Sequence, residues 1–322
     1  MATPKYGVIT PQGWRLDLVS IKDPIDKYEH MTRFAQEAER LGYDSVWVYD
    51  HLHTVPTQEL ETTFECWIST AGLARDTKTI RIGQMVTCNN YRNPALLAKM
   101  ASTVDVMSHG RLDFGIGAGW YEEEFRAYGY DFPDGPTRLK MLREALQIIH
   151  AMWRDDYATF EGKFYSVNGA INEPKGVQKP HIPLWIGGSG EKVTLKLVAQ
   201  YGDACNISGF TPAEYKHKLD VLKEHCDSVG RDYGTILKTS HNFITLLAPG
   251  DDPEKVTAPF RRGLSLEDYR KRVVVASPQE LVDYLGTLQE IGLEYFVIYF
   301  RNDLTRFDTI QLFAEEVMNR RL

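Results

Sequence analysis

Long hydrophobic runs are absent from this sequence. No window approaches the roughly 18 uninterrupted apolar residues that a membrane-spanning helix needs. Residues 1–6 lead into a short strand-like segment rather than into the apolar core of a signal peptide. The sequence therefore predicts no membrane association and a cytoplasmic location.

Cysteine is also scarce, and basic residues are outnumbered. The four cysteines, Cys66, Cys88, Cys205 and Cys226, form no CxxC pair, which favours reduced, mostly buried thiols over a metal site or a disulfide framework. The 44 acidic residues exceed the 37 basic ones and give a formal charge of −7. A general nucleic-acid binder needs a basic face to displace counterions, so this charge argues against that class.

The sequence does contain a strand-helix alternation from end to end, in which short hydrophobic segments are followed by amphipathic ones. Strands are expected at residues 6–10, 45–49, 80–87, 112–116, 184–186, 204–207, 236–246 and 295–300. Helices are expected at residues 25–41, 63–75, 94–108, 138–153, 191–201, 212–229, 278–291 and 305–320. Eight such units predict the α/β class and a (β/α)8 TIM barrel, with a doubly wound sheet as the competing architecture.

Two connections are longer than such a barrel needs. Residues 157–183 contain strand-like pieces and several prolines, which predicts an insertion that carries a hairpin. Residues 248–276 are polar and include a basic run at 270–272. Long insertions commonly carry lids or ligand contacts, and neither segment resembles a linker. We therefore expect a single domain over residues 1–322 with insertions near 157–183 and 248–276.

Asp50 and His51 follow the second predicted strand, where a barrel keeps its chemistry. A histidine gives and takes protons near neutral pH, and an adjacent carboxylate orients a ring or a ligand N–H. The alternative is an aspartate that caps a loop beside a solvated histidine. His51 and His53 also form an HxH pair typical of metal-dependent barrel hydrolases. No other histidine follows a strand in the way further ligands would, so we expect no metal.

The segment GIGAG (115–119) follows the fourth predicted strand. It is one residue short of the dinucleotide fingerprint, and its glycines are better explained by close approach of backbone to a flat ring or to a neighbouring strand. The three glutamates at 122–124 are interpreted as the first turn of a helix, where carboxylates suit the helix dipole. Trp120 and Tyr121 are expected to form a pocket wall.

The segment GGSG (187–190) precedes a predicted helix. Gly187, Gly188 and Gly190 expose backbone N–H groups, Ser189 adds a hydroxyl, and the next helix directs its positive end at the same place. These features predict a phosphate site, which barrel enzymes favour at their later strands. A plain glycine-rich turn is the alternative.

Two segments, GAGWYEEEFRAYGYDFP (117–133) and PLWIGGSGEKVTLKLVAQYGDACNI (183–207), resemble the luciferase-like monooxygenase superfamily. Within it, they are most similar to the oxidoreductases that depend on the deazaflavin coenzyme F420. The resemblance spans nearly the whole chain and implies a (β/α)8 barrel with insertions, in agreement with the strand count.

The resemblance also implies roles for individual residues. Asp50 and His51 match the pair that lies against the deazaflavin ring, with His51 as proton donor or acceptor. Met85 and Val86 match a bulge in the third strand, often a non-proline cis peptide, that supports the back face of the ring. The remaining cofactor contacts implied are the phosphate loop (Gly187, Gly188, Ser189, Gly190) and two polar contacts (Asn90, Asn206).

For the reaction, the resemblance implies hydride transfer between coenzyme F420 and a small organic substrate. The expected substrate pocket is aromatic and consists of Trp14, Trp47, Trp120 and Tyr121. Sugar-phosphate dehydrogenases of the superfamily carry an acidic residue where this chain has Trp120. This departure places glucose-6-phosphate oxidation in doubt and favours an apolar or aromatic substrate.

Three alternatives stay open at the level of sequence. An FMN-dependent monooxygenase that uses reduced flavin and O2 would need the same phosphate loop. A non-catalytic flavin-binding barrel and a metal-dependent hydrolase are the others. The partners implied are a homodimer and an enzyme that reduces the cofactor. Seven basic residues are expected either to receive the glutamate tail of F420 or to be solvated: Lys175, Lys179, Arg261, Arg262, Arg270, Lys271 and Arg272.

Overall fold

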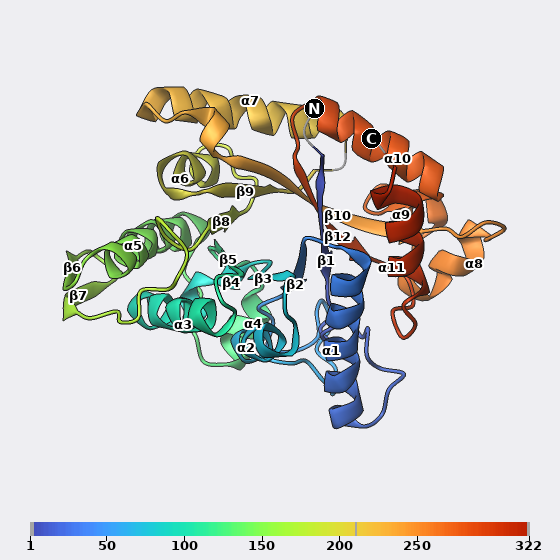
Figure 1. The fold of residues 1–322 in the computed structure, drawn as a ribbon, viewed down its shortest axis with the longest axis horizontal. Helices are drawn as coiled ribbons and strands as arrows, with labels where there is room; N and C mark the ends of the chain where they lie inside the picture. The colour runs from blue at the N-terminus through green and yellow to red at the C-terminus, as the bar shows by residue number, and fades with distance from the viewer. Residues whose placement is uncertain (1–2, 210, 321–322) are drawn as a thin grey trace.

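In the computed structural model, eight parallel strands close into a barrel with helices around it (Figure 1), which confirms the predicted architecture. The structure describes residues 3–209 and 211–320. In cyclic order around the barrel the strands are β1 (Lys5–Ile9), β2 (Ser45–Val48), β3 (Arg81–Gln84), β5 (Leu112–Gly117), β8 (Leu184–Gly187), β9 (Ala204–Ile207), β10 (Leu237–Leu246) and β12 (Tyr295–Phe300). Pairing of β10 with β9 completes the circle.

Several of the outer helices begin where the sequence provides both a cap and a proline. The residues that cap α1, α3, α7 and α10 are Asp23, Asn93, Thr211 and Ser277, and each is followed by proline at the first helical position. The outer helices are α1 (Pro24–Leu41), α2 (Cys66–Asp76), α3 (Pro94–Met107), α5 (Gly135–Arg154), α6 (Thr194–Tyr201), α7 (Pro212–Val229), α10 (Pro278–Glu290) and α11 (Asp308–Phe313).

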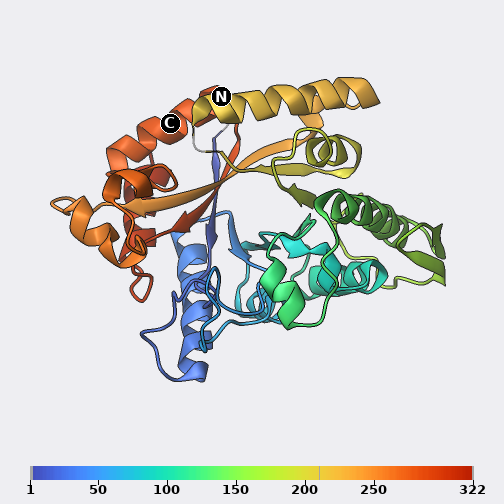
Figure 2. The same ribbon diagram turned by 180° about the vertical axis from the view of Figure 1, so that it is seen from behind.

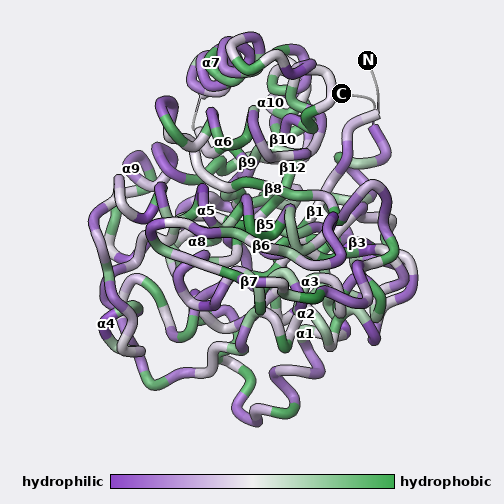
Figure 3. The backbone as a smooth tube through the Cα atoms, turned by 90° about the vertical axis from the view of Figure 1, so that its left-hand side faces the viewer, coloured by the Kyte–Doolittle hydropathy of each residue, from purple (hydrophilic) through white to green (hydrophobic). Residues whose placement is uncertain are grey.

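Hydrophobic residues gather in two layers. The larger layer lies between the strands and the outer helices, and the hydrophobic segments of the chain run through the middle of the molecule in Figure 3. The smaller layer fills the barrel itself with aromatic rings, including Trp47 and Trp185, whose centroids are 4.6 Å apart. Gly83 leaves room for Trp47, since a Cβ there would lie 2.2 Å from its ring. The barrel is therefore a packed core with an opening at one end.

The glycines of the fourth barrel strand make room for the segment that follows β3. Residues 80–87, expected as one strand, divide into β3 and β4 (Thr87–Cys88) around a non-proline cis peptide between Met85 and Val86, as the resemblance implied. A Cβ on Gly117 would lie 2.8 Å from the Val86 side chain, and one on Gly187 equally close. The GIGAG segment therefore permits close approach of a neighbouring strand.

Gly115→Ala is expected to destabilise the protein by about 3 kcal/mol or more, because the added Cβ overpacks a closed strand interface. An ideal Cβ at this position would lie 1.9 Å from the backbone carbonyl oxygen of Gln84, which cannot rotate away. Gly135→Ala is the matched control, since nothing lies within 4 Å of its Cβ position. It should change stability by less than about 0.5 kcal/mol. Urea unfolding of both variants measures the difference, and equal stabilities would contradict this packing argument.

The two insertions lie on opposite sides of the molecule, as Figures 1 and 2 both show. The first carries the expected hairpin, formed by β6 (Ala158–Glu161) and β7 (Ser166–Ala170). The second contains α8 (Pro253–Thr257), α9 (Leu266–Arg270) and β11 (Val274–Ala276), and β11 extends the sheet beside β10. The seven basic residues therefore do not form one patch, because Lys175 and Lys179 belong to the first insertion and the others to the second.

Three further expectations are settled by the described residues. The C-terminal helix, expected over 305–320, is α11 followed by a π-helical turn, Ala314–Met318. All four cysteines are buried and unpaired, as their spacing predicted. Within 3–209 and 211–320, no helix combines the length and apolar character needed to cross a bilayer.

Candidate active site

A cavity of about 240 Å³ opens at the carboxyl ends of the barrel strands. Its walls come from loops that follow β1, β2, β3 and β5 and from the outer half of β10. The lining residues are Trp14, Arg15, Tyr49, Asp50, His51, Met85, Val86, Thr87, Cys88, Tyr91, Gly119, Trp120, Tyr121, Glu124, His241 and Phe243. Segments far apart in sequence therefore converge where a barrel carries its active site.

His51 lies in this cavity and is held by a carboxylate. Its Nδ1 is 3.1 Å from Oε2 of Glu124, and both side chains are buried. The ring also stacks on Trp14, with centroids 4.6 Å apart and an interplanar angle of 16°. Because Nδ1 is bound to Glu124, Nε2 is the ring nitrogen left for a ligand in the cavity.

Glu124 is one of the site residues that sequence reasoning missed. The three glutamates do form the first turn of a helix, α4 (Glu122–Ala127), as expected. Glu124 nevertheless turns inward and accepts hydrogen bonds from the Tyr91 hydroxyl at 2.7 Å and the Leu52 backbone N–H at 2.5 Å, in addition to its contact with His51. Burial alone would raise the pKa of Glu124, but these bonds hold it below its usual value, so the carboxylate is ionised.

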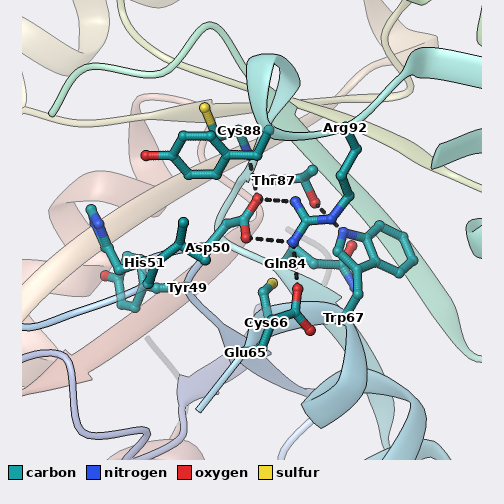
Figure 4. Close-up of polar contacts among 12 residues, drawn as sticks. Tyr49, Asp50, His51, Glu65, Cys66, Trp67, Gln84, Thr87, Cys88 and Arg92 are labelled. Carbon is teal, nitrogen blue, oxygen red and sulfur yellow. Dashed lines mark hydrogen bonds and ion pairs between the residues drawn. The ribbon is translucent and has the colours of Figure 1, made fainter. Parts of the chain in front are cut away.

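The Asp50 carboxylate points away from His51, and both of its oxygens are bound by protein groups, as Figure 4 shows. Its Oδ2 accepts from the Cys88 backbone N–H at 2.8 Å and from Arg92 Nη1 at 2.6 Å, while Oδ1 accepts from Arg92 Nη2 at 3.0 Å. Arg92 also contacts Glu65. Asp50 lines the cavity, but its carboxylate is bound to protein groups, so the expected contact of this carboxylate with a ligand stays a prediction. Asp50 instead fixes the backbone of β4, which forms one wall of the cavity.

Three of the four expected pocket aromatics do line the cavity. Trp14 is buried, and its indole Nε1 has no hydrogen-bond partner among the described residues. Tyr121 is anchored by its hydroxyl, which donates to the Pro56 carbonyl at 2.7 Å. Trp120 is 61% exposed and meets His51 edge-on at 5.9 Å. Together these rings surround His51 with mostly apolar surface, Trp14 parallel to its ring and Trp120 and Tyr121 edge-on.

Trp47 is the exception, and its assignment to the pocket was wrong. It is fully buried in the barrel interior, against Trp185. Side chains two residues apart on a strand point to the same face, so Trp47 and Tyr49 both point inward. Tyr49 reaches the mouth and lines the cavity, whereas Trp47 lies one layer deeper.

The two expected asparagine contacts also lie away from the cavity. Asn206 is buried in the barrel, where its Nδ2 donates to Thr239 Oγ1 at 3.3 Å. Asn90 lines a separate cleft with Tyr130, Phe132 and Tyr165. The resemblance placed both near the ring, but strand β9 directs Asn206 into the core, and Asn90 lies in the short helical turn Asn89–Tyr91 beside the separate cleft.

The GGSG loop lies outside the cavity walls, and two of its polar groups already form hydrogen bonds within the protein. The Gly188 N–H donates to the Asn206 carbonyl at 3.2 Å, and the Ser189 hydroxyl donates to the Ser208 carbonyl at 3.1 Å. The helix expected from residue 191 begins at Thr194, three residues later. No side chain caps the N-terminus of α6. One first-turn N–H, that of Leu195, already donates to the Gly190 carbonyl at 3.0 Å, so an anion here would depend on the positive end of the helix and on the other N–H groups.

A family model described as luciferase-like monooxygenase matches residues 5–295. The chain belongs to this family. It is accordingly a flavin- or deazaflavin-dependent oxidoreductase, as the resemblance implied.

Individual known proteins match nearly the whole of this luciferase-like chain. The F420-dependent glucose-6-phosphate dehydrogenase of Microbacterium testaceum (strain StLB037) is 27% identical in an alignment of 315 positions that covers 89% of this chain and 91% of that protein. An F420-dependent secondary alcohol dehydrogenase, solved with an F420-acetone adduct, has a TM-score of 0.81 at 22% identity and covers 99% of this chain and 100% of that one. The EDTA monooxygenase of Chelativorans sp. BNC1 has a TM-score of 0.83 at 14% identity, covering 98% and 93%. The two solved structures share the fold.

A second histidine of this luciferase-like protein, His241, lies at the cavity on β10. Its Nε2 is 2.6 Å from the Tyr49 hydroxyl. Burial, and then the Arg15 charge, lower the pKa of His241 to about 4. Burial raises the pKa of Tyr49 well above its usual value, so the phenol stays protonated and donates to a neutral His241. Sequence reasoning did not single out this residue, because it lies in the middle of a long strand.

The low pKa of His241 predicts that the protein loses stability in acid. The folded state resists protonation of this ring between its ordinary pKa of 6.5 and about 4, whereas the unfolded chain takes up the proton. The contribution of neutral His241 to the free energy of unfolding is therefore complete above pH 6.5. It is lost as pH falls to about 4, by roughly 3 kcal/mol in total. His241→Gln should remove this part of the pH dependence. Unfolding free energies at pH 7 and pH 4.5 measure it, and parallel pH profiles for both proteins would contradict the assignment.

The His51-x-His53 pair is divided between two environments. His53 turns away from the cavity, and its Nδ1 lies 2.9 Å from the Thr54 carbonyl. In the part of the chain that the structure describes, no group of three or more His, Cys, Asp or Glu side chains is placed to hold a metal ion.

Proposed function

We propose that this protein transfers a hydride between coenzyme F420 and a small organic substrate. The arrangement that carries the proposal is His51, with Nδ1 bound to an ionised carboxylate and Nε2 left for the cavity, beside an aromatic wall. The choice of F420 rests on relatives, since an F420-dependent dehydrogenase aligns with 89% of the chain.

The residues present fit a deazaflavin ring. Trp120 offers a flat apolar face, Met85 and Val86 form another part of the wall, and the unpartnered Trp14 Nε1 supplies a hydrogen-bond donor. The loop at 187–190 and the uncapped N-terminus of α6 would hold the cofactor's phosphate. When bound, the deazaflavin supplies a ring carbon that accepts or gives a hydride.

The protein's own contribution is orientation and a proton. Glu124 fixes the His51 ring through Nδ1 and stabilises the imidazolium that forms when Nε2 takes a proton from a substrate hydroxyl. The reverse reaction uses the same nitrogen to donate a proton. Trp14, stacked on the His51 ring, keeps bulk water from one face of this pair.

The substrate class follows from the cavity walls. Trp120 and Tyr121 present aromatic faces at the entrance, which favours a substrate with an apolar or aromatic part. The glucose-6-phosphate specificity of one relative is not carried over, because Trp120 stands where an acidic residue is expected in that group.

Titration of the apo-protein with coenzyme F420 and, separately, with FMN tests the proposal. Trp14 lies in the cavity, so ring binding should quench intrinsic tryptophan fluorescence. We expect F420 to bind at least about tenfold more tightly than FMN, a difference of roughly 1.4 kcal/mol. Tighter binding of FMN would contradict the proposal and favour a monooxygenase that uses reduced flavin and O2; a solved monooxygenase shares this fold.

A further inference from the structure

A basic cleft adjoins the candidate active site. Its volume is about 810 Å³, and it shares Arg15 and Phe243 with the walls of the cavity. The second insertion covers one side of it, and the residue after β12 forms another. The cleft is lined by Arg15, Pro56, Phe243, Phe260, Arg261, Arg262, Leu264, Tyr269, Lys271, Arg272, Val273 and Arg301.

The charges along this cleft have one sign. Six of its lining residues are cationic and none is acidic, in a chain whose net charge is −7. Arg261 pairs with Glu254, and Lys271 pairs with Asp268. Among the described residues, the other four, Arg15, Arg262, Arg272 and Arg301, have no carboxylate within ion-pair distance. Asp17 acts on Arg301 electrostatically, but it does not line the cleft, and burial raises its pKa to about 6.

Arg15 connects the cleft to the reacting groups. Its guanidinium lies 4.4 Å over the Trp14 ring, and Trp14 in turn stacks on His51. The Arg15 Nε is buried and has no hydrogen-bond partner in the described chain. Burial lowers the pKa of Arg15, and the neighbouring Arg301 and Arg262 charges lower it further. An anion bound here would satisfy the unpaired donor and relieve the repulsion between the guanidinium groups.

The position of the cleft separates it from the expected phosphate loop. Arg15 follows β1, and Arg301 follows β12, which is the neighbour of β1 in the barrel. The GGSG loop follows β8, which lies four strands from β1 in either direction and therefore opposite to it. A cofactor anchored at β8 with its ring in the central cavity leaves the β1–β12 side open for a second ligand.

We propose that this cleft binds an anionic group, carboxylate or phosphate, at one end of the substrate, whose reacting carbon lies beside His51. This inference rests on the proposed function, since it names the substrate class of the same site. The substrate is then amphiphilic, with an apolar or aromatic part against Trp120 and Tyr121 and an anionic end at Arg15 and Arg301. The same anionic chemistry is present in the glutamate tail of F420, so a test must distinguish substrate from cofactor.

The test measures binding of inorganic phosphate and of phenyl phosphate by calorimetry at low salt. Arg15→Gln and Arg301→Gln should each raise the dissociation constant of both probes about tenfold, because each removes a charge-assisted contact. Arg272→Gln, at an exposed position, should have a smaller effect in the same direction. Arg143→Gln on α5, exposed and outside the cleft, is the control and should leave binding unchanged. Arg301→Lys keeps the charge, so it should bind more tightly than Arg301→Gln if both fold.

The second experiment repeats the phosphate and phenyl phosphate titrations with two loaded proteins. One is saturated with coenzyme F420, and the other with a form of F420 that lacks the glutamates. If the cleft serves the substrate, both probes still bind the loaded protein, and the Arg15 and Arg301 variants keep their F420 affinity. Displacement of phosphate by full-length F420 alone would overturn the proposal in favour of the cofactor's tail. Phosphate binding that is equal in wild type and all variants would overturn it outright. If phosphate binding depends on Arg15 but F420 does not bind, the anion site is supported and the proposed function is contradicted instead.

Discussion

Arg92→Met is expected to destabilise the protein by about 3–5 kcal/mol, the usual cost of leaving one member of a buried ion pair without its partner. The Asp50 side chain is 1% exposed and depends on Arg92 for both of its oxygens. Methionine fills a similar volume but donates no hydrogen bond. The Asp50 carboxylate would then be buried with a single donor, the Cys88 backbone N–H. Urea unfolding monitored by circular dichroism measures the loss.

A matched control separates this effect from loss of an ordinary surface ion pair. Arg126 pairs with Glu122 one turn away on α4, and its side chain is 72% exposed. Arg126→Met should therefore cost less than about 0.5 kcal/mol. Asp50→Asn combined with Arg92→Met should recover part of the lost stability, because no buried charge remains. Equal losses in Arg92→Met and Arg126→Met would mean that the Asp50–Arg92 pair does not stabilise the β4 wall.

His51→Asn is expected to lower kcat by about 100- to 10,000-fold, the range typical of a positioned acid–base group. Asparagine keeps a polar side chain near Glu124 but cannot take a proton. Affinity for coenzyme F420 should change little, since the aromatic wall and the phosphate loop remain. Turnover is measured by loss or gain of F420 absorbance with whichever substrate a screen of amphiphilic alcohols and carbonyl compounds identifies.

The HxH pair supplies the control for this prediction. His53 is also buried and lies two residues away, but it does not line the cavity. His53→Asn should therefore leave kcat within about threefold of wild type, a difference of less than 1 kcal/mol in barrier height. A similar loss in both variants would point to general disturbance of the loop, and an active His51→Asn protein would exclude His51 as the proton carrier.

Sequence patterns predicted the barrel well, because each of its signals is local. A capping residue followed by proline marks several helix starts, and hydrophobic segments mark strands. Most elements therefore lie within a few residues of their predicted positions. The cavity wall at Met85 and Val86 was also anticipated, through the family resemblance. The glycines of β5 then follow from packing, since Val86 occupies the space that their missing side chains leave.

The contacts within the site were harder to predict, because they depend on which way a side chain turns. Nothing in the run of three glutamates distinguishes Glu124, which turns inward to His51, from Glu122, which pairs with Arg126 outside. Asp50 precedes His51 in sequence, yet in the loop after β2 the two side chains point in different directions. Arg92 and His241 carry no motif at all. Their importance follows only from the tertiary fold, which brings them to Asp50 and Tyr49.

The most direct test of this account is a crystal structure of the protein with coenzyme F420 bound. The deazaflavin ring is expected to lie in the cavity lined by Met85, Val86, Trp14 and Trp120, with His51 Nε2 facing the ring's reactive carbon. The phosphate should lie at residues 187–190, and the β1–β12 side with Arg15 and Arg301 should remain open. A ring bound outside this cavity, or a phosphate bound at Arg15 and Arg301, would contradict it.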